Sequence, residues 1–250
     1  MDLPSSDTAQ IAVSIVVPVR NEADNIAPLI AEITAALDRR WVYEIIYVND
    51  GSTDATSERL LAAMKQRPNL RQIRHTTSSG QSAAVRSGVR AARGAIVATL
   101  DGDGQNNPVF LPALISAIED GGERTGLAAG QRVGRKDTGF KKLQSRIANA
   151  VRSSILHDGT RDTGCGLKAF RREVFLALPY FDGLHRFLPA LVRREGYEIS
   201  YVDVIDRPRH SGVSKYGFFD RLWIGIMDLA GVWWLIRRKK TTTAAIEVTL

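Results

Sequence analysis

The first half of the chain alternates between apolar strand-like segments and amphipathic helix-like segments, and this alternation restricts the possible folds most strongly. Short apolar runs predict buried strands at residues 13–19, 43–50, 70–75 and 95–101. Between and after them, apolar residues at helical spacing predict helices over 23–38, 53–66, 80–94 and 108–120. Strands that alternate with helices predict an α/β protein with a mainly parallel central sheet flanked by helices.

One domain is enough for most of the chain. The 250 residues contain no internal repeat and no segment rich in Pro, Gly or Ser that would separate two domains. We therefore expect a single domain over residues 12–216, a flexible N-terminus at 1–11 and a flexible tail at 241–250. The opening MDLPSSDTAQ lacks the basic and apolar regions of a secretory signal, and the single cysteine, Cys165, suits a reducing compartment.

Three of the predicted strands end in polar, charged segments, namely PVRNE, VNDGSTD and LDGDGQ. In open α/β sheets, ligands bind outside the carboxyl ends of the strands. These three segments are therefore expected to form one ligand site.

Two aspartates, Asp101 and Asp103, follow the strand at 95–101. Residues i and i+2 of an extended chain point the same way, so the two carboxylates would converge, with Gly102 and Gly104 adding no bulk between them. Converging carboxylates repel unless a proton or a cation lies between them, and oxygen ligands suit Mg²⁺ or Mn²⁺. An acidic turn without any ligand is the alternative interpretation of this segment alone.

Several common sites are missing from the sequence. There is no G-x-x-x-x-G-K-[ST] loop, no G-x-G-x-x-G after the first strand and no G-x-S-x-G elbow. Cysteine and histidine residues show no zinc-ligand spacing. The usual nucleotide-binding loops, a structural zinc site and a serine-hydrolase site are therefore not expected.

Positive charge is concentrated in the second half of the chain. Residues 1–118 contain 11 Lys and Arg against 12 Asp and Glu, whereas residues 119–250 contain 23 against 15. This distribution favours an anionic partner there: phosphates, a membrane surface or nucleic acid.

Six collinear segments between about residues 12 and 236 identify a resemblance. They are SIVVPVRNEADNI, YEIIYVNDGSTDAT, GQSAAVRSGVRAARGAIVATLDGDGQNNP, DTGCGLKAFRREVF, HRFLPAL and RPRHSGVSKYG. Together they resemble the family 2 inverting glycosyltransferases with the GT-A fold, and within them the dolichyl- or polyprenyl-phosphate hexosyltransferases. The resemblance implies a donor half at 12–118 and an acceptor half at 119–216.

The resemblance also implies roles for individual residues. Pro18, Arg20, Glu22 and Asp50 would line the nucleotide pocket, with Asp50 contacting the base or the ribose. Asp101, Gly102, Asp103 and Gln105 would bind the sugar diphosphate, and Asp101, Asp103 and Gln105 would hold the metal. The chain departs from the family at Arg20, where an aromatic residue is frequent, and at Asn49-Asp50, where an Asp-Asp pair is common.

Basic residues of the second half have candidate roles in the same site. Arg207, Arg209 and Lys215 lie in RPRHSGVSKYG, a glycine-containing loop able to close over a diphosphate, and a solvated basic loop is the alternative. Arg132 follows a short apolar segment and is a candidate for holding donor or acceptor phosphates. Asp162 stands where a general base would deprotonate a hydroxyl acceptor; an ionised lipid phosphate needs no base, and Asp162 would then orient another group.

Two segments are candidates for membrane contact. Residues 140–155 predict a helix with one apolar face, for which core packing and membrane contact are both open. Residues 217–240 predict an amphipathic helix at an anionic membrane surface, with three tryptophans before the basic cluster RRKK. Its apolar part, 222–236, is shorter than the about 20 residues that a span needs and contains Asp228.

The sequence therefore predicts a metal-dependent transferase that moves a hexosyl unit from a GDP- or UDP-linked sugar to a polyprenyl phosphate. It would be peripheral, at the cytoplasmic face of a membrane, with Mg²⁺ or Mn²⁺ as cofactor and no nucleic-acid partner. One alternative is a transferase that acts on a sugar hydroxyl with Asp162 as base. Another is a non-catalytic protein that binds anions or nucleic acid through the basic half.

Overall fold

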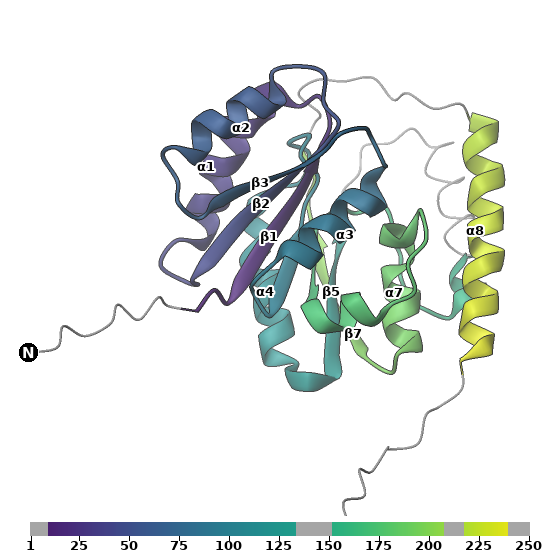
Figure 1. The fold of residues 1–250 in the computed structure, drawn as a ribbon. Coiled ribbons are helices and arrows are strands. Elements are labelled where there is room, and N and C mark those ends of the chain that lie inside the picture. Colours follow the sequence, from purple (N-terminus) through teal and green to yellow (C-terminus); the bar gives the residue numbers. More distant parts are fainter. Residues whose placement is uncertain (1–9, 134–151, 208–217, 240–250) are drawn as a thin grey trace, which may run out of the picture.

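A seven-stranded sheet forms the centre of the protein in this computed structural model, which describes residues 10–133, 152–207 and 218–239 (Figure 1). Within the last range, side chains are described from residue 225 onward. The strands are β1 (Val13–Val19), β2 (Tyr43–Asp50), β3 (Leu70–His75), β4 (Ile96–Thr99), β5 (Thr125–Arg132), β6 (Lys168–Arg171) and β7 (Glu198–Val204).

The order of the strands brings nearly all of their carboxyl ends to one edge. The order is β3-β2-β1-β4-β6-β5-β7, and β1 to β4 are mutually parallel. Strand β6 runs antiparallel to both β4 and β5, and β5 is parallel to β7. Six strands therefore end at the same edge, and β6 begins there. The expected α/β fold with a mainly parallel sheet is confirmed.

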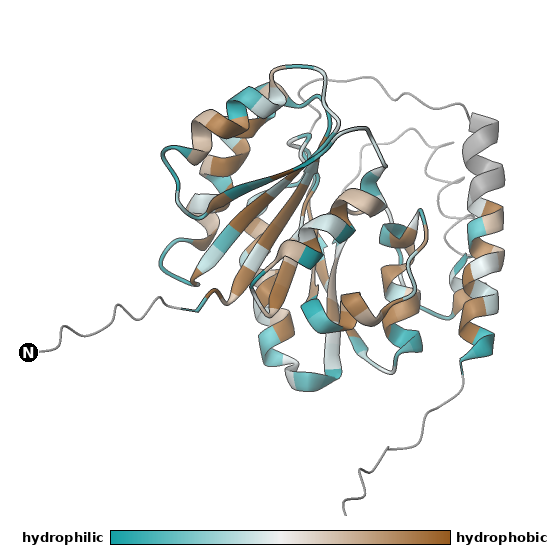
Figure 2. Ribbon diagram, viewed as in Figure 1, coloured by the Kyte–Doolittle hydropathy of each residue, from teal (hydrophilic) through white to brown (hydrophobic). Residues whose placement is uncertain are grey.

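Helices cover both faces of this sheet (Figure 1). On one face, α1 (Ile26–Leu37), α2 (Thr56–Met64) and α4 (Leu111–Asp120) share a core with Val13, Ile15 and Val17 of β1. On the other face, α3 (Gln81–Ala91), α6 (Arg172–Ala177) and α7 (Leu184–Arg194) share a core with Val16. Burial on both faces explains why the strands are continuously apolar, as Figure 2 shows for the centre of the sheet.

The elements expected in the first half are all present, with small shifts at their ends. The segment predicted as one helix over 23–38 begins with a 3-10 turn, η1 (Ala23–Asn25), before α1. Strand β4 ends at Thr99, so both aspartates of LDGDGQ lie in the following loop. A second turn, η2 (Pro108–Phe110), precedes α4 and is capped by Asn107, whose side chain accepts a hydrogen bond from Val109 N (3.1 Å). A third, η3 (Gly122–Arg124), leads into β5.

The C-terminal helix expected at 217–240 is present as α8 (Phe218–Arg238) and lies along the outside of the domain beside α7 (Figure 1). Val232 is buried, and Leu229, Leu235 and Ile236 are partly buried against the α7 side of the core. Throughout the described ranges, no helix combines the length and the hydropathy required for a membrane span.

The helix expected over 140–155 lies mostly outside the described residues. Residues 152–156 are helical, and Leu156 is buried in the same core as α7. The N-terminus up to residue 9 and the tail from residue 240 also lie outside the described ranges, so the expectations for these segments stay predictions.

Candidate active site

Polar side chains from distant parts of the chain meet at the carboxyl edge of the sheet. Strand β1 brings Pro18, β2 brings Asp50 as its last residue, β4 leads into Asp101, and β5 ends at Arg132. The antiparallel strand β6 begins at the same edge with Lys168, opposite Thr99 of β4. The parallel topology therefore gathers the three polar strand ends that the sequence singled out.

The loop after β4 approaches β1 so closely that only glycine fits at position 102. A Cβ on Gly102 would lie 2.2 Å from Val19 Cγ1 and 3.0 Å from Pro18 O. A Cβ on Gly166 would likewise lie 2.3 Å from Asp101 Oδ2. The two glycines thus let the carboxylate of Asp101 lie between the start of β6 and the end of β1.

Asp101 is fixed by one contact from α3 and one from its own loop. Gln81 Nε2, at the start of α3, donates to Asp101 Oδ1 (2.7 Å), and Asp101 N donates to Asn106 Oδ1 (2.9 Å). Burial, followed by repulsion from Asp103, raises the pKa of Asp101 to about 6. Two carboxylates that repel each other in a poorly solvated loop favour a bound cation.

These residues can provide some of the ligands of a divalent ion, and oxygen atoms of a bound phosphate can provide others. Asp103 is 9 % exposed, and its Oδ1 accepts a hydrogen bond from Gln105 N (3.1 Å). Among the described residues, no group of three or more His, Cys, Asp and Glu side chains lies close enough together to hold an ion alone. Two carboxylates leave several positions of a hard cation for oxygen atoms of a diphosphate or water.

Hydrogen bonds connect this loop to the ends of β5 and β7. Asn106 Nδ2 donates to Asp206 Oδ1 (3.3 Å), just after β7, and Arg132 Nη1 donates to Asp206 Oδ2 (3.3 Å). Backbone N–H of Arg207 donates to the carbonyl of Gln105 (2.9 Å). The loop that follows β4 and the start of the basic loop after β7 are therefore parts of one site.

Arg132 and Asp162 form a largely buried ion pair. Nε and Nη2 of Arg132 donate to the two oxygens of Asp162 (2.5 and 2.8 Å), and the two side chains are 16 % and 14 % exposed. Burial alone would raise the pKa of Asp162, but the hydrogen bonds and charge of Arg132 outweigh it and lower that pKa. Asp162 is therefore an ionised, hydrogen-bonded carboxylate and a weak proton acceptor.

Asp50 is directed into the loop between β3 and α3. Its carboxylate accepts hydrogen bonds from Ser78 Oγ (2.7 Å), Ser79 N (2.8 Å) and Gly80 N (3.0 Å), and lies 2.7 Å from His75 Nδ1. Burial would raise its pKa, and these hydrogen bonds lower it instead. Because all four acceptor positions of the carboxylate are in use, a base or ribose would have to displace one of these donors.

The loop between β1 and α1 carries Arg20 and Glu22. Arg20 is exposed directly after β1. Glu22 N donates to Thr56 Oγ1 (2.9 Å), and Asn25 Nδ2 donates to Glu22 Oε2 (2.6 Å), which ties this loop to the start of α2. The structure brings both residues to the same edge of the sheet as Asp50, as the sequence predicted.

The basic loop after β7 is only partly described. Arg209 and Lys215 lie outside the described residues. The guanidinium of Arg207 donates to both carboxylate oxygens of Glu32 on α1 (2.9 and 2.6 Å). Arg207 therefore fastens the start of this loop to α1, a role that the sequence did not indicate.

Sequence reasoning also missed four other residues of the site: Gln81, Asn106, Lys168 and Asp206. Asn106 stands directly after Gln105 in the polar run GQNN, and Lys168 lies within the segment DTGCGLKAF that carried the resemblance. Their positions in these segments were the available signal. Gln81 lies in the segment GQSAAVRSGVRAARGAIVATLDGDGQNNP, which also carried the resemblance, whereas Asp206 gave no signal because only a tertiary contact brings it to Arg132.

This topology, with paired aspartates in the loop after β4, defines a protein with the GT-A fold of nucleotide-diphospho-sugar transferases. Glucosyl-3-phosphoglycerate synthase from Mycobacterium tuberculosis, solved with Mn²⁺, UDP and glucosyl-3-phosphoglycerate, is similar with a TM-score of 0.66 and 20 % identity. The match covers 90 % of this chain and 80 % of that one. The same enzyme solved with Mn²⁺, UDP-glucose and glycerol 3-phosphate gives a TM-score of 0.65 at 21 % identity, with the same coverage. At these identities the likeness shows the fold alone.

The chain belongs to glycosyl transferase family 2, whose sequence model matches residues 14–178. It is 36 % identical over 239 residues to the dodecaprenyl-phosphate galacturonate synthase of Rhizobium johnstonii, covering 92 % of this chain and 68 % of that protein. It is 34 % identical to the undecaprenyl-phosphate 4-deoxy-4-formamido-L-arabinose transferase of Photorhabdus laumondii, covering 82 % of this chain and 63 % of that protein. The chain thus spans about two thirds of the length of these relatives.

Proposed function

We propose that the protein transfers a glycosyl unit from a nucleotide-diphosphate sugar to a polyprenyl phosphate with inversion at the anomeric carbon. One observation carries this proposal. At the carboxyl edge of a family 2 domain, hydrogen bonds through Asp206 connect the loop of the paired aspartates to the Arg132–Asp162 pair. Relatives at 36 % and 34 % identity are described as polyprenyl-phosphate sugar transferases, which supports this choice of acceptor.

The aspartates are assigned to the donor diphosphate. Asp101 and Asp103 would hold Mg²⁺ or Mn²⁺, with Gln105 beside them, and the neighbours solved with Mn²⁺ and UDP support a metal and a uridine nucleotide. A bound divalent ion supplies positive charge to the leaving diphosphate. Gln81 fixes the orientation of Asp101, and Gly102 lets the loop lie against β1, so the chain holds the ligand oxygens ready for the ion.

Arg132 is assigned to phosphate binding and Asp162 to positioning. Arg132 donates to both Asp162 and Asp206. Gly164 leaves space beside the guanidinium, because a Cβ on Gly164 would lie 3.0 Å from Arg132 Nη2. A phosphate acceptor is already ionised at neutral pH and requires position and orientation rather than a base. The strong pairing of Asp162 supports the phosphate acceptor over the alternative hydroxyl acceptor, for which Asp162 would have to take a proton.

We assign membrane contact to the outer face of α8. Large apolar side chains are exposed on that face: Ile226 (49 %), Met227 (57 %), Trp233 (39 %) and Trp234 (53 %). The guanidinium groups of Arg237 and Arg238 lie 4.4 Å and 5.7 Å from the ring centres of these two tryptophans. Aromatic rings beside basic groups suit the headgroup region of an anionic membrane. The cytoplasmic side stays a prediction.

One assay tests the proposal directly. The protein is incubated with Mn²⁺, short polyprenyl phosphates and a panel of UDP- and GDP-linked sugars, and products are read by mass spectrometry. We expect a glycosylated polyprenyl phosphate from at least one donor. Transfer only to a glycan hydroxyl would favour the alternative enzyme. Tight binding of duplex DNA without binding of any nucleotide diphosphate in titration calorimetry would favour the non-catalytic alternative.

A further inference from the structure

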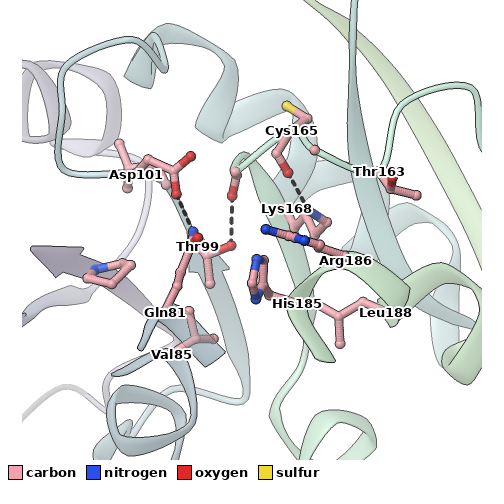
Figure 3. A pocket seen from close by; sticks show the side chains of 14 residues that line it. Gln81, Val85, Thr99, Asp101, Thr163, Cys165, Lys168, His185, Arg186 and Leu188 are labelled. Atoms are coloured by element: carbon pink, nitrogen blue, oxygen red, sulfur yellow. Dashed lines mark hydrogen bonds between the residues drawn. The ribbon is translucent and has the colours of Figure 1, made fainter. Parts of the chain in front are cut away.

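A small cavity is lined in part by Asp101 (Figure 3). Its volume is about 180 Å³, and it is lined from β1, β4, the start of α3, the loop at 163–166, the start of β6 and the first turn of α7. Asp101, Lys168, His185 and Arg186 line it, together with Cys165, whose thiol is neutral because burial raises its pKa to about 11. The cavity therefore borders the position assigned to the donor diphosphate at Asp101.

Lys168 lines the cavity without an ion-pair partner in the described part of the chain, although Asp101 and Asp162 attract its charge from farther away. It is 4 % exposed, because β6 lies between β4 and β5 and pairs Lys168 with Thr99 and with Ala129. Its Nζ donates to the carbonyl of Cys165, and within the described residues no carboxylate lies within 4.0 Å of it. Burial lowers its pKa. An ammonium group buried without a paired anion is costly, and it has three protons to donate.

A second cation borders the same space. Arg186, on the first turn of α7, also lines the cavity and is labelled in Figure 3. Arg186 also interacts electrostatically with Asp228 of α8. Burial raises the pKa of Asp228, and the charge of Arg186 opposes that shift. His185 contributes no positive charge at neutral pH, because burial lowers its pKa to about 3, and its Nδ1 lies 2.7 Å from Ser82 Oγ. Among the described residues that line the cavity, two cations therefore stand against one carboxylate, that of Asp101.

Resting on the proposed function, we propose that this cavity takes the donor glycosyl group and that this group carries a carboxylate, as in a hexuronic acid, bound by Lys168 and Arg186. The metal assigned to Asp101 and Asp103 would neutralise the aspartates on the diphosphate side. The carboxylate would supply the anion that Lys168 lacks, through charge-assisted hydrogen bonds. A neutral hexose would leave the buried ammonium without an ion-pair partner.

Titration calorimetry with Mn²⁺ tests the proposal, using UDP, UDP-galactose, UDP-galacturonic acid, UDP-glucose and UDP-glucuronic acid, and the GDP series in parallel. We expect the wild-type protein to bind at least one uronic acid donor more tightly than its neutral counterpart by about tenfold or more, the value of one charge-assisted hydrogen bond. The affinity for UDP or GDP without a sugar measures binding at the nucleotide and metal site separately from binding of the glycosyl group.

Two variants connect that preference to the cavity. Lys168→Gln keeps hydrogen-bond donors and removes the charge, and we expect it to abolish the preference while binding of the sugar-free nucleotide persists. Arg186→Gln changes an exposed side chain and leaves the core intact, and we expect it to weaken the preference in the same direction. Lys65→Gln, on the exposed end of α2, is the matched control and should behave as wild type.

The outcomes distinguish failure of the uronic acid proposal from failure of the proposed function. Nucleotide binding with equal affinity for uronic and neutral donors would overturn the uronic acid proposal and leave the proposed function standing. If Lys168→Gln raises the KM for the polyprenyl phosphate without changing the donor preference, the uronic acid proposal is also overturned. Lys168 would then be assigned to the acceptor phosphate. Absence of nucleotide binding in both series would overturn the proposed function together with it.

Discussion

Arg132 and Asp162, which are 30 residues apart in the chain, form a two-point ion pair at the centre of the candidate site. The pair joins the end of β5 to the loop before β6, and Asp206 accepts a further hydrogen bond from the same guanidinium. Because the arginine donates to two carboxylates through different edges of its guanidinium, the orientation of that group is fixed. This geometry suits a group that presents positive charge at a constant position rather than one that moves a proton.

Asp162→Asn should lower turnover moderately and leave transfer detectable. Asparagine keeps the shape of Asp162 and one acceptor for Arg132 but cannot act as a base. The expected loss in kcat with a polyprenyl phosphate acceptor is smaller than the about 10²–10⁴-fold that loss of a general base costs. A loss in that range, together with transfer to a free hydroxyl by the wild type, would support Asp162 as the base.

Arg132→Gln should destabilise the protein as well as impair transfer. Removing the cation leaves Asp162 buried without its partner, which costs about 3–5 kcal/mol for a buried pair, and less here because Asp162 is 14 % exposed and can gain water. Urea unfolding measures the change. Arg124→Gln, at a guanidinium that is 82 % exposed, is the control and should leave the unfolding free energy unchanged. Equal stability of the two variants would contradict the structural role of the pair.

Asp103→Asn should abolish transfer without unfolding the protein. The change removes half of the charge that would hold the ion, so donor affinity in calorimetry should become insensitive to Mn²⁺. Asp120→Asn, exposed at the end of α4, is the matched control. Wild-type activity that persists undiminished in excess chelator would exclude the metal assignment.

The outer face of α8 and the basic cluster after it should bind anionic vesicles. Replacing Arg237, Arg238, Lys239 and Lys240 by Gln is expected to weaken liposome binding by about 1 kcal/mol per residue near the surface. Replacing four exposed basic residues elsewhere, Arg39, Arg40, Arg59 and Lys65, makes the same change in net charge and should weaken binding far less. Flotation with anionic and neutral vesicles measures both. If detergent releases the protein from membranes and carbonate does not, α8 is inserted more deeply than a helix bound at the surface.

Stability should fall as the pH drops below about 6.5 because of His185. The folded protein holds the pKa of this buried ring at about 3, against its ordinary value of 6.5. Between these values the unfolded chain binds a proton that the folded protein does not, so the unfolding free energy decreases by up to about 1.4 kcal/mol per pH unit as pH falls. His185→Gln should reduce this slope in urea unfolding between pH 7.5 and 5. Parallel slopes for the two proteins would show that folding does not lower the pKa of His185.

The alternation of strands and helices could be predicted from the sequence because apolar periodicity is a local signal. Residues 13–19 and 43–50 form β1 and β2 with the predicted ends, since both faces of these strands are covered and every residue had to be compatible with burial. The polar strand ends were predictable for the same reason. Once the strands are parallel, Asp50 and Asp101 must reach the same edge of the sheet.

What each polar side chain does there was decided by tertiary structure. The sequence placed Asp50 and Asp162 in the site but could not show that Asp50 binds the loop before α3 or that Asp162 pairs with Arg132. Lys168 shows the limit most clearly: β6 is a four-residue strand, and its antiparallel insertion between β4 and β5 turns a lysine within the segment DTGCGLKAF into a buried cation. Local propensity specifies whether a segment is a strand. The partners of a side chain depend on contacts between segments 30 to 100 residues apart in this chain, and these exist only after the sheet is assembled.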